Sequence, residues 1–184
     1  MTDLARHVQS LECFARRLGV RLERSTLPSR VHGRTLPDHI TLALQLSIEE
    51  ELAALIHELA HWLVHRPRRG LPPARSAVEA TLYEYEAEAV EALVMERLGC
   101  ADQNRAARDP LARFAEGDPT ADLLAVSVRR VRIAATRLSR VLESAELSSE
   151  SQPAVDLDAA AGEEIVLENE AHRLGDLLGL AQPL

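Results

Sequence analysis

Two histidines one helical turn apart are the residues of this sequence best suited to chemistry. His57 and His61 enclose Glu58 in the run His57-Glu58-Leu59-Ala60-His61, an HExxH motif. Helical side chains four positions apart project from the same face, so two neutral imidazoles at this spacing can bind one metal ion. The motif favours Zn²⁺, and Glu58 can then act as the general base that takes a proton from an attacking water. So short a motif also arises by chance, so its surroundings decide its weight.

The residues around the motif predict the helix that it requires. Ser47 and Glu50 form a capping box, and acidic residues fill the first turn. Apolar positions then recur at helical spacing through the motif, and Pro67 follows its end. These positions are Ile48, Leu52, Leu55, Ile56, Leu59 and Leu63. The histidines therefore lie beside a face that can be buried.

A zinc peptidase site needs a third protein ligand and one open coordination position. The extended pattern HExxHxxGxxH is excluded, because Val64 and Pro67 occupy its Gly and third His positions. The other route is a glutamate from the following helix, where Glu84, Glu86 and Glu88 are candidates. Glu84 and Glu88 share a face and Glu86 points away from it, and spacing alone leaves Glu86 only slightly ahead. A solvated acidic face explains most glutamates of this helix.

Two segments resemble the ImmA/IrrE-type metallopeptidases, whose ligand pattern is the gluzincin-like HExxH…E. They are Ile48–His65, with its EELAALIHELAH run, and Tyr83–Val90, with YEYEAEAV. The similarity is greatest to the metallopeptidase domain that follows the single-stranded-DNA-binding domain of ArdC-type antirestriction proteins, and it covers roughly residues 16–100. Two departures count: no separate DNA-binding domain is expected before the motif, and the segment after 144 matches nothing in the family.

The resemblance implies a set of roles and a function. His57 and His61 would be zinc ligands and Glu58 the general base. Glu86 would be the third ligand, because the conserved family glutamate precedes an alanine, here Ala87. The implied activity is a zinc-dependent metalloendopeptidase with a specific cytoplasmic protein or peptide substrate, for which a DNA-binding regulatory protein is one candidate. The alternatives are a non-catalytic metal-binding accessory, antirestriction or regulatory module, against which the intact Glu58 argues, and a helical protein with a coincidental motif.

Other side chains near the motif have more ordinary explanations. His65 lies one turn beyond His61 and could border a substrate, although helix-end histidines are commonly structural. Tyr83 and Tyr85 could donate to an oxyanion, but packing against the metal helix is the commoner role.

Periodicity predicts the elements that position these residues. We expect helices over about 3–18, 75–98 and 120–143 beside the motif helix, and strands at Val20–Arg24, near Arg30–Arg34 and at Ile40–Leu44. This pattern predicts an α+β fold, a minimal zincin-like metallopeptidase domain. It would combine a small three-stranded sheet, the HExxH helix, a Glu-bearing return helix and a mostly helical C-terminal half. Ile40–Leu44 is expected to be an edge strand that adds an extended peptide substrate to the sheet.

Charge divides the chain into two parts. The net charge is −8, and the acidic excess falls in 144–184, so we expect a metallopeptidase domain over 1–143 and an acidic linker and helical tail over 144–184. That tail could be autoinhibitory or mimic DNA.

The basic residues are all arginine. Five of them lie on the helix near 120–143, interspersed with core positions, so direct nucleic-acid binding is not expected. Cys13 and Cys100 should be reduced thiols, and with no signal peptide or membrane-spanning run we expect a cytoplasmic protein without a membrane partner.

Overall fold

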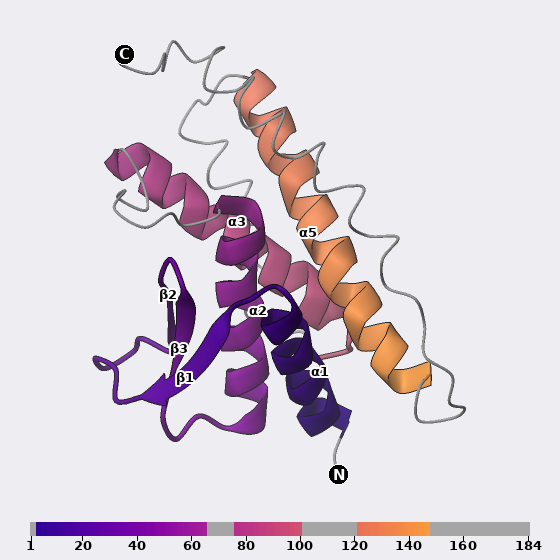
Figure 1. Cartoon of the computed structure of the whole chain (residues 1–184). Coiled ribbons are helices and arrows are strands. Elements are labelled where there is room, and N and C mark those ends of the chain that lie inside the picture. The colour runs from indigo at the N-terminus through magenta and orange to yellow at the C-terminus, as the bar shows by residue number, and fades with distance from the viewer. Residues whose placement is uncertain (1–2, 66–75, 101–120, 148–184) are drawn as a thin grey trace. The chain divides into compact units, whose positions relative to one another are not determined.

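The computed structural model describes residues 3–65, 76–100 and 121–147 (Figure 1). This part of the chain contains four α-helices and one three-stranded sheet, so the expected α+β class is confirmed. Helix α5 runs past the expected boundary at 143, and the expected tail helix lies outside the described residues. The elements in order are α1 (Asp3–Arg17), β1 (Arg21–Ser25), β2 (Gly33–Thr35), β3 (His39–Ala43), α2 (Ile48–His65), α3 (Ala77–Arg97) and α5 (Ala121–Leu147).

The sheet has the strand order β1-β3-β2. Strand β3 pairs in parallel with β1 and antiparallel with β2. The prediction of an edge strand at Ile40–Leu44 is therefore wrong, because these residues form the central strand, which is hydrogen-bonded on both sides. The burial of Ile40, Thr41 and Leu42 on both faces of the strand is typical of a central position. The edge strand on the side of the motif helix is β2, which contacts α2.

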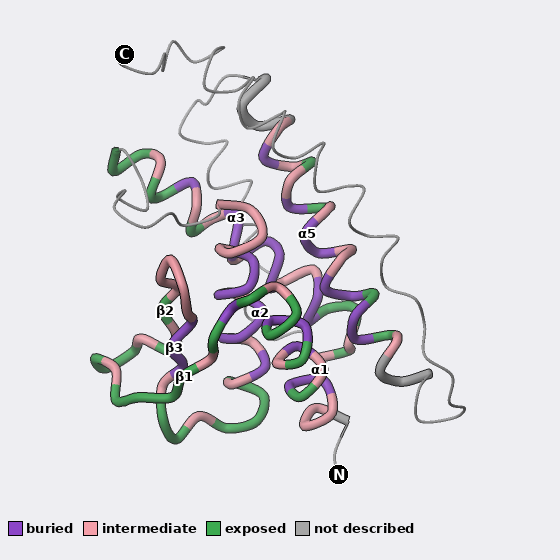
Figure 2. Tube along the Cα trace, in the orientation of Figure 1, coloured by how far each residue is buried: buried purple, intermediate pink, exposed green. Residues whose placement is uncertain are grey.

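Helix α2 is the element around which the others pack. It contacts α1, α3, α5, β2 and β3, and the buried segments in Figure 2 gather where these helices meet. Its side chains Leu52, Leu55 and Leu59 are fully buried, as the apolar spacing predicts. Full burial of an aliphatic side chain contributes roughly 1.5–3 kcal/mol, so this face holds α2 firmly in place. The histidines of α2 are thus carried on a rigid element.

The beginnings of both site helices are capped by serine. Ser47 and Glu50 bond reciprocally, with a Glu50 amide to Ser47 Oγ distance of 3.2 Å and a Ser47 amide to Glu50 Oε2 distance of 2.8 Å. The predicted capping box is therefore confirmed. Ser76 caps α3 by accepting a hydrogen bond from the Glu79 amide at 3.1 Å. These caps satisfy amides that lack a partner within their helix.

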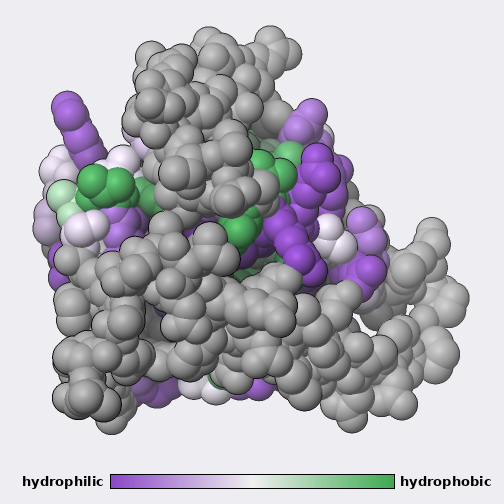
Figure 3. Space-filling model, turned by 90° about the horizontal axis from the view of Figure 1, so that it is seen from above, coloured by the Kyte–Doolittle hydropathy of each residue, from purple (hydrophilic) through white to green (hydrophobic). Residues whose placement is uncertain are grey.

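The surface of the described residues has few exposed apolar side chains. Large hydrophobic residues are exposed at Leu44, Ile48 and Val78. Where Figure 3 leaves the described residues visible, hydrophobic and hydrophilic side chains lie side by side. Within the described ranges, none of the helices has the length and apolar character needed to span a membrane. Cys13 and Cys100 are free thiols.

Candidate metal centre

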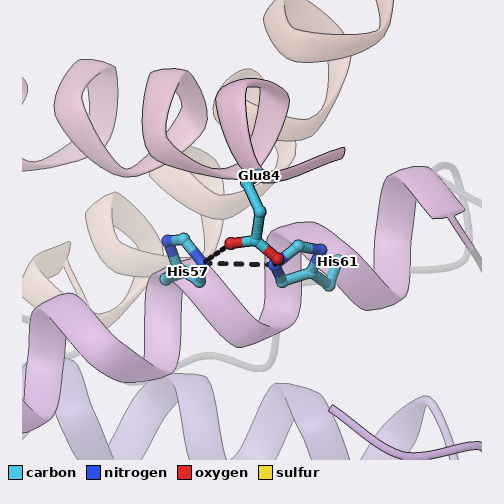
Figure 4. Close-up of side chains that lie close together, drawn as sticks. All are labelled: His57, His61 and Glu84. Atoms are coloured by element: carbon cyan, nitrogen blue, oxygen red, sulfur yellow. Dashed lines mark hydrogen bonds and ion pairs between the residues drawn. The ribbon is translucent and has the colours of Figure 1, made fainter. Parts of the chain in front are cut away.

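The structure brings the two motif histidines together with Glu84. The Nε2 atoms of His57 and His61 face each other at 3.1 Å, and the Glu84 carboxylate reaches down from α3 between the rings (Figure 4). One oxygen of Glu84 lies 3.5 Å from Nε2 of His57, and the other lies 3.5 Å from Nε2 of His61. In the described part of the chain, this is the group of His, Cys, Asp and Glu side chains whose atoms converge as metal ligands would.

The spacing of these donor atoms fits a small cation. Bonds of about 2.0–2.1 Å to a tetrahedral zinc ion place neighbouring ligand atoms about 3.3–3.4 Å apart. The two histidine Nε2 atoms lie 3.1 Å apart, and each of them lies 3.5 Å from a different oxygen of the Glu84 carboxylate. Two imidazole nitrogens and one carboxylate also form a ligand set that zinc commonly takes in catalytic sites, with a fourth position open. The donor chemistry therefore suits Zn²⁺, and one ligand atom from each of the three residues lies within 4.8 Å of the others.

The structure does not bring Glu86, the third ligand implied by the resemblance, to the histidine pair. Glu86 is fully buried, whereas the Glu84 side chain is 60% exposed at the cleft. Two residues along a helix turn the side chain by about 200°, so these two glutamates leave α3 in nearly opposite directions. The face with Glu86 and Val90 packs into the core, and the face with Glu84 meets the histidines. Glu84 is therefore the glutamate of α3 that joins the histidine group, and Glu86 and Glu88 are not part of that group.

Glu91 provides a second carboxylate behind His57. Its Oε2 lies 3.3 Å from Nδ1 of His57, on the ring edge opposite Nε2. Burial lowers the pKa of His57, but hydrogen bonds to Glu84 and Glu91 outweigh it and raise the pKa to about 10. The same histidines hold the pKa of Glu84 well below its usual range. Two carboxylates thus flank His57, and Glu91 lies where a partner that orients a ligating histidine would be.

His65 and Tyr83 pack behind His61. Nδ1 of His65 lies 3.1 Å from Nδ1 of His61, and Nε2 of His65 lies 2.8 Å from Oε2 of Glu86. The Tyr83 ring stacks on His65 with centroids 3.9 Å apart, while its hydroxyl donates to Oε1 of Glu79 at 2.7 Å. Burial lowers the pKa of His65 to about 4, against the opposing effect of Glu86. Tyr83 thus has the packing role that was expected to be the commoner one.

Glu58 lies beside the metal group and against β2. The Thr35 hydroxyl is 2.7 Å from Oε2 of Glu58 and 2.9 Å from its backbone carbonyl oxygen. Burial raises the pKa of Glu58 above its ordinary value, although the Thr35 hydrogen bond opposes the change. At Gly33 the strand comes so close that a Cβ there would lie 2.6 Å from both Cγ and Oε1 of Glu58. Glycine at 33 therefore permits the close packing of the strand on this carboxyl group.

A cleft of about 550 Å³ opens over these groups. Its floor is formed by α2 and α3, and one wall is formed by 30–35, which includes β2. Hydrogen bonds at His32 and Leu36 face β3, and the backbone directions alternate along a strand, so the amide and carbonyl groups of Gly33 and Thr35 point to the outer edge. The cleft therefore has a strand edge beside Glu58 that can pair with an extended chain.

Several of these residues were not selected from the sequence. Glu91 lies seven positions after Glu84, which is two helical turns, and this spacing could have identified it as a partner on the same face. Gly33 and Thr35 meet Glu58 only through the fold, and no local pattern marks them. Arg130 is one of the five arginines on the helix near 120–143, and no partner could be assigned to it from the sequence. In the structure its Nη2 donates a hydrogen bond to Oε1 of Glu86 at 2.7 Å.

Comparisons with protein-family models, with curated proteins and with solved structures found no match to this chain.

Proposed function

We propose that the protein is a zinc-dependent metalloendopeptidase whose ligands are His57, His61 and Glu84. The observation that carries the proposal is the convergence of two histidine Nε2 atoms and a carboxylate at metal-ligand spacing, with Glu58 beside them in an open cleft. A site that only stabilises a fold is normally closed by four protein ligands. Three ligands facing a cleft are typical of catalytic sites, which keep a position for water or substrate.

The roles of the side chains follow from their positions. Bound zinc would supply a Lewis acid that lowers the pKa of a water molecule and polarises the scissile carbonyl. Glu58 adjoins the ligands in sequence and space, and its raised pKa brings the carboxyl closer to the pH at which a general base and acid works well. It would accept the proton of the attacking water and pass it to the leaving amine. Thr35 and Gly33 would hold the Glu58 carboxyl in place.

The outer edge of β2 would bind the substrate as an added strand. The outward amide and carbonyl groups at Gly33 and Thr35 can pair with an extended peptide, which would then run along the cleft past Glu58. Binding of this kind would bring the scissile bond of a protein segment, rather than a small molecule, beside Glu58. A specific protein substrate, such as a DNA-binding regulator, belongs to this proposal through the resemblance to ImmA/IrrE-type enzymes.

The second candidate is a metal-binding module without catalysis, and Glu58→Gln separates the two. This change keeps the size of the side chain and removes its basicity, so an enzyme should retain zinc and lose at least about 100-fold in the rate of peptide hydrolysis. Zinc-loaded protein would be incubated with an internally quenched peptide library, with Glu23→Gln on the exposed strand β1 as the matched control. Equal cleavage by the wild type and Glu58→Gln would overturn the role of Glu58 as the general base. No cleavage of peptides or folded DNA-binding proteins by the zinc-loaded wild type would favour the module.

A further inference from the structure

We propose that His65, Glu86 and Arg130 form a buried chain that positions His61, fixing its ring tautomer so that Nε2 is left bare for the metal. The inference rests on the proposed metal site, but it assigns a role to residues outside the ligand set. The chain runs from Nδ1 of His61 to His65 at 3.1 Å, from His65 to Glu86 at 2.8 Å and from Glu86 to Arg130 at 2.7 Å. Each link joins a different pair of side chains, and the last one reaches α5.

The directions of these hydrogen bonds follow from the Arg130 end. Oε1 of Glu86 is paired with the guanidinium of Arg130, so Glu86 is an ionised carboxylate that can only accept. Nε2 of His65 must therefore donate to Oε2 of Glu86. A neutral imidazole carries one N–H, so Nδ1 of His65 is bare and accepts from Nδ1 of His61. The hydrogen of His61 is thus held on Nδ1, and its Nε2 lone pair faces His57 and Glu84.

Burial makes this chain rigid. The side chain of Glu86 is fully buried, that of His65 is 4% exposed and that of Arg130 is 19% exposed. The positive charge of Arg130 already balances the negative charge of Glu86, so the buried His65 ring between Glu86 and His61 is the neutral imidazole. Stacking on Tyr83 fixes the plane of the His65 ring. A turn of the His61 ring would break its hydrogen bond to His65 and leave Nδ1 of the buried His65 without that partner.

The two histidine ligands therefore have different hydrogen-bond partners at Nδ1. His57 meets one carboxylate directly, since Glu91 lies behind its Nδ1. His61 instead meets a second histidine, with the carboxylate one step further away. Partners behind metal-ligating histidines typically change metal affinity 10- to 100-fold when they are removed. The chain also explains why Glu86 is buried in this helix without being a ligand.

Two variants of His65 test the chain. His65→Phe keeps a ring that can stack on Tyr83 but removes both nitrogens, and we expect zinc affinity, measured by competition with a chromophoric chelator, to fall roughly 10- to 100-fold. His65→Gln can accept from His61 through its amide oxygen and donate to Glu86 through its amide nitrogen, so it should recover most of that loss. His39→Phe, at a partly buried histidine bonded to Asp38 away from the site, is the matched control and should bind zinc as the wild type does.

A second readout needs no metal. Nitrogen-15 NMR of histidine-labelled, metal-free protein should show His65 as the Nε2–H tautomer and His61 with its hydrogen on Nδ1. A hydrogen on Nδ1 of His65, unchanged zinc affinity in His65→Phe, or equal losses in the Phe and Gln variants would each overturn the chain. Failure of the wild type to bind zinc would instead overturn the proposed function, while the tautomers would still decide whether the chain exists.

Discussion

Replacing Gly33 by alanine tests how tightly β2 packs on Glu58. The new Cβ would lie 2.6 Å from Cγ and Oε1 of Glu58 and 2.9 Å from its Cδ. Ordinary contacts between carbon atoms are about 3.5–4.0 Å long, so the strand or the side chain must move by about 1 Å. Crowding of this kind costs about 1–3 kcal/mol of stability. We expect Gly33→Ala to lower the free energy of unfolding by that amount.

A double-mutant cycle shows whether Glu58 is the cause. In Glu58→Ala the Cγ, Cδ and Oε1 atoms are gone, so adding alanine at 33 should then cost only a few tenths of a kcal/mol. The loss of the Thr35 partner is common to both proteins that lack Glu58 and cancels in the cycle. The coupling energy should therefore approach the full cost of crowding, about 1–3 kcal/mol. Urea unfolding of the four proteins without metal measures it.

Gly99→Ala is the matched control for this cycle. Gly99 has φ 70° and no atoms within 4 Å of an added Cβ, so alanine there is strained but not crowded, and its cost should add to that of Glu58→Ala. A coupling energy between positions 33 and 58 below about 0.5 kcal/mol would refute the close packing of β2 on Glu58, because changes at independent sites add within that margin. The role assigned to Gly33 would then be lost.

Two further predictions concern side chains around the site. Glu91→Gln should weaken zinc binding about 10- to 100-fold in chelator competition, because the neutral amide holds the His57 ring less firmly than a carboxylate does; an affinity equal to that of the wild type would show that Glu91 has no orienting role. Ser47→Ala should lower the melting temperature at neutral pH, because it removes the hydroxyl that accepts a hydrogen bond from the Glu50 amide. The backbone amide of residue 47, the larger cause of the lowered pKa of Glu50, stays in the variant, and only the smaller contribution of the side chain is lost. A carboxyl group whose pKa is lowered on folding stabilises the fold at any pH above its pKa in the unfolded chain, and this stabilisation is lost as the pH falls through its pKa in the folded protein. The difference in melting temperature between Ser47→Ala and the wild type should therefore narrow in acid. A difference in melting temperature that widened in acid would contradict this prediction.

The sequence was a good guide to the elements because their signals are local. The capping box at Ser47 and the apolar spacing from Leu52 to Leu59 placed α2, and period-two patterns placed the strands within a few residues. The order in which the strands pair in the sheet is not determined by local sequence. Strand β3 lies between β1 and β2, and its central residues are buried on both faces. The pattern from His39 to Ala43 alone did not distinguish a central strand from an edge strand.

Only the part of the candidate site that lies on α2 could be predicted from the sequence. His57, Glu58 and His61 share a turn of α2, so their proximity follows from the motif. The choice among the glutamates of α3 depended on how that helix rotates against α2 and α5. Arg130 on α5 pairs with Glu86 on one face of α3, and Glu84 on the opposite face meets the histidines. A partner 44 positions away leaves no mark in the local pattern.

Metal content of the purified protein tests the central claim most directly, with wild type, His57→Ala, Glu84→Ala and Glu86→Gln compared after loading with zinc and removal of the excess. We expect about one zinc ion per chain in the wild type and none retained in His57→Ala or Glu84→Ala. Glu86→Gln should still bind zinc, with reduced affinity, because the change weakens the chain behind His61 without removing a ligand. Zinc retained in Glu84→Ala but lost in Glu86→Gln would contradict the ligand set, and no zinc in the wild type would contradict the metal site itself.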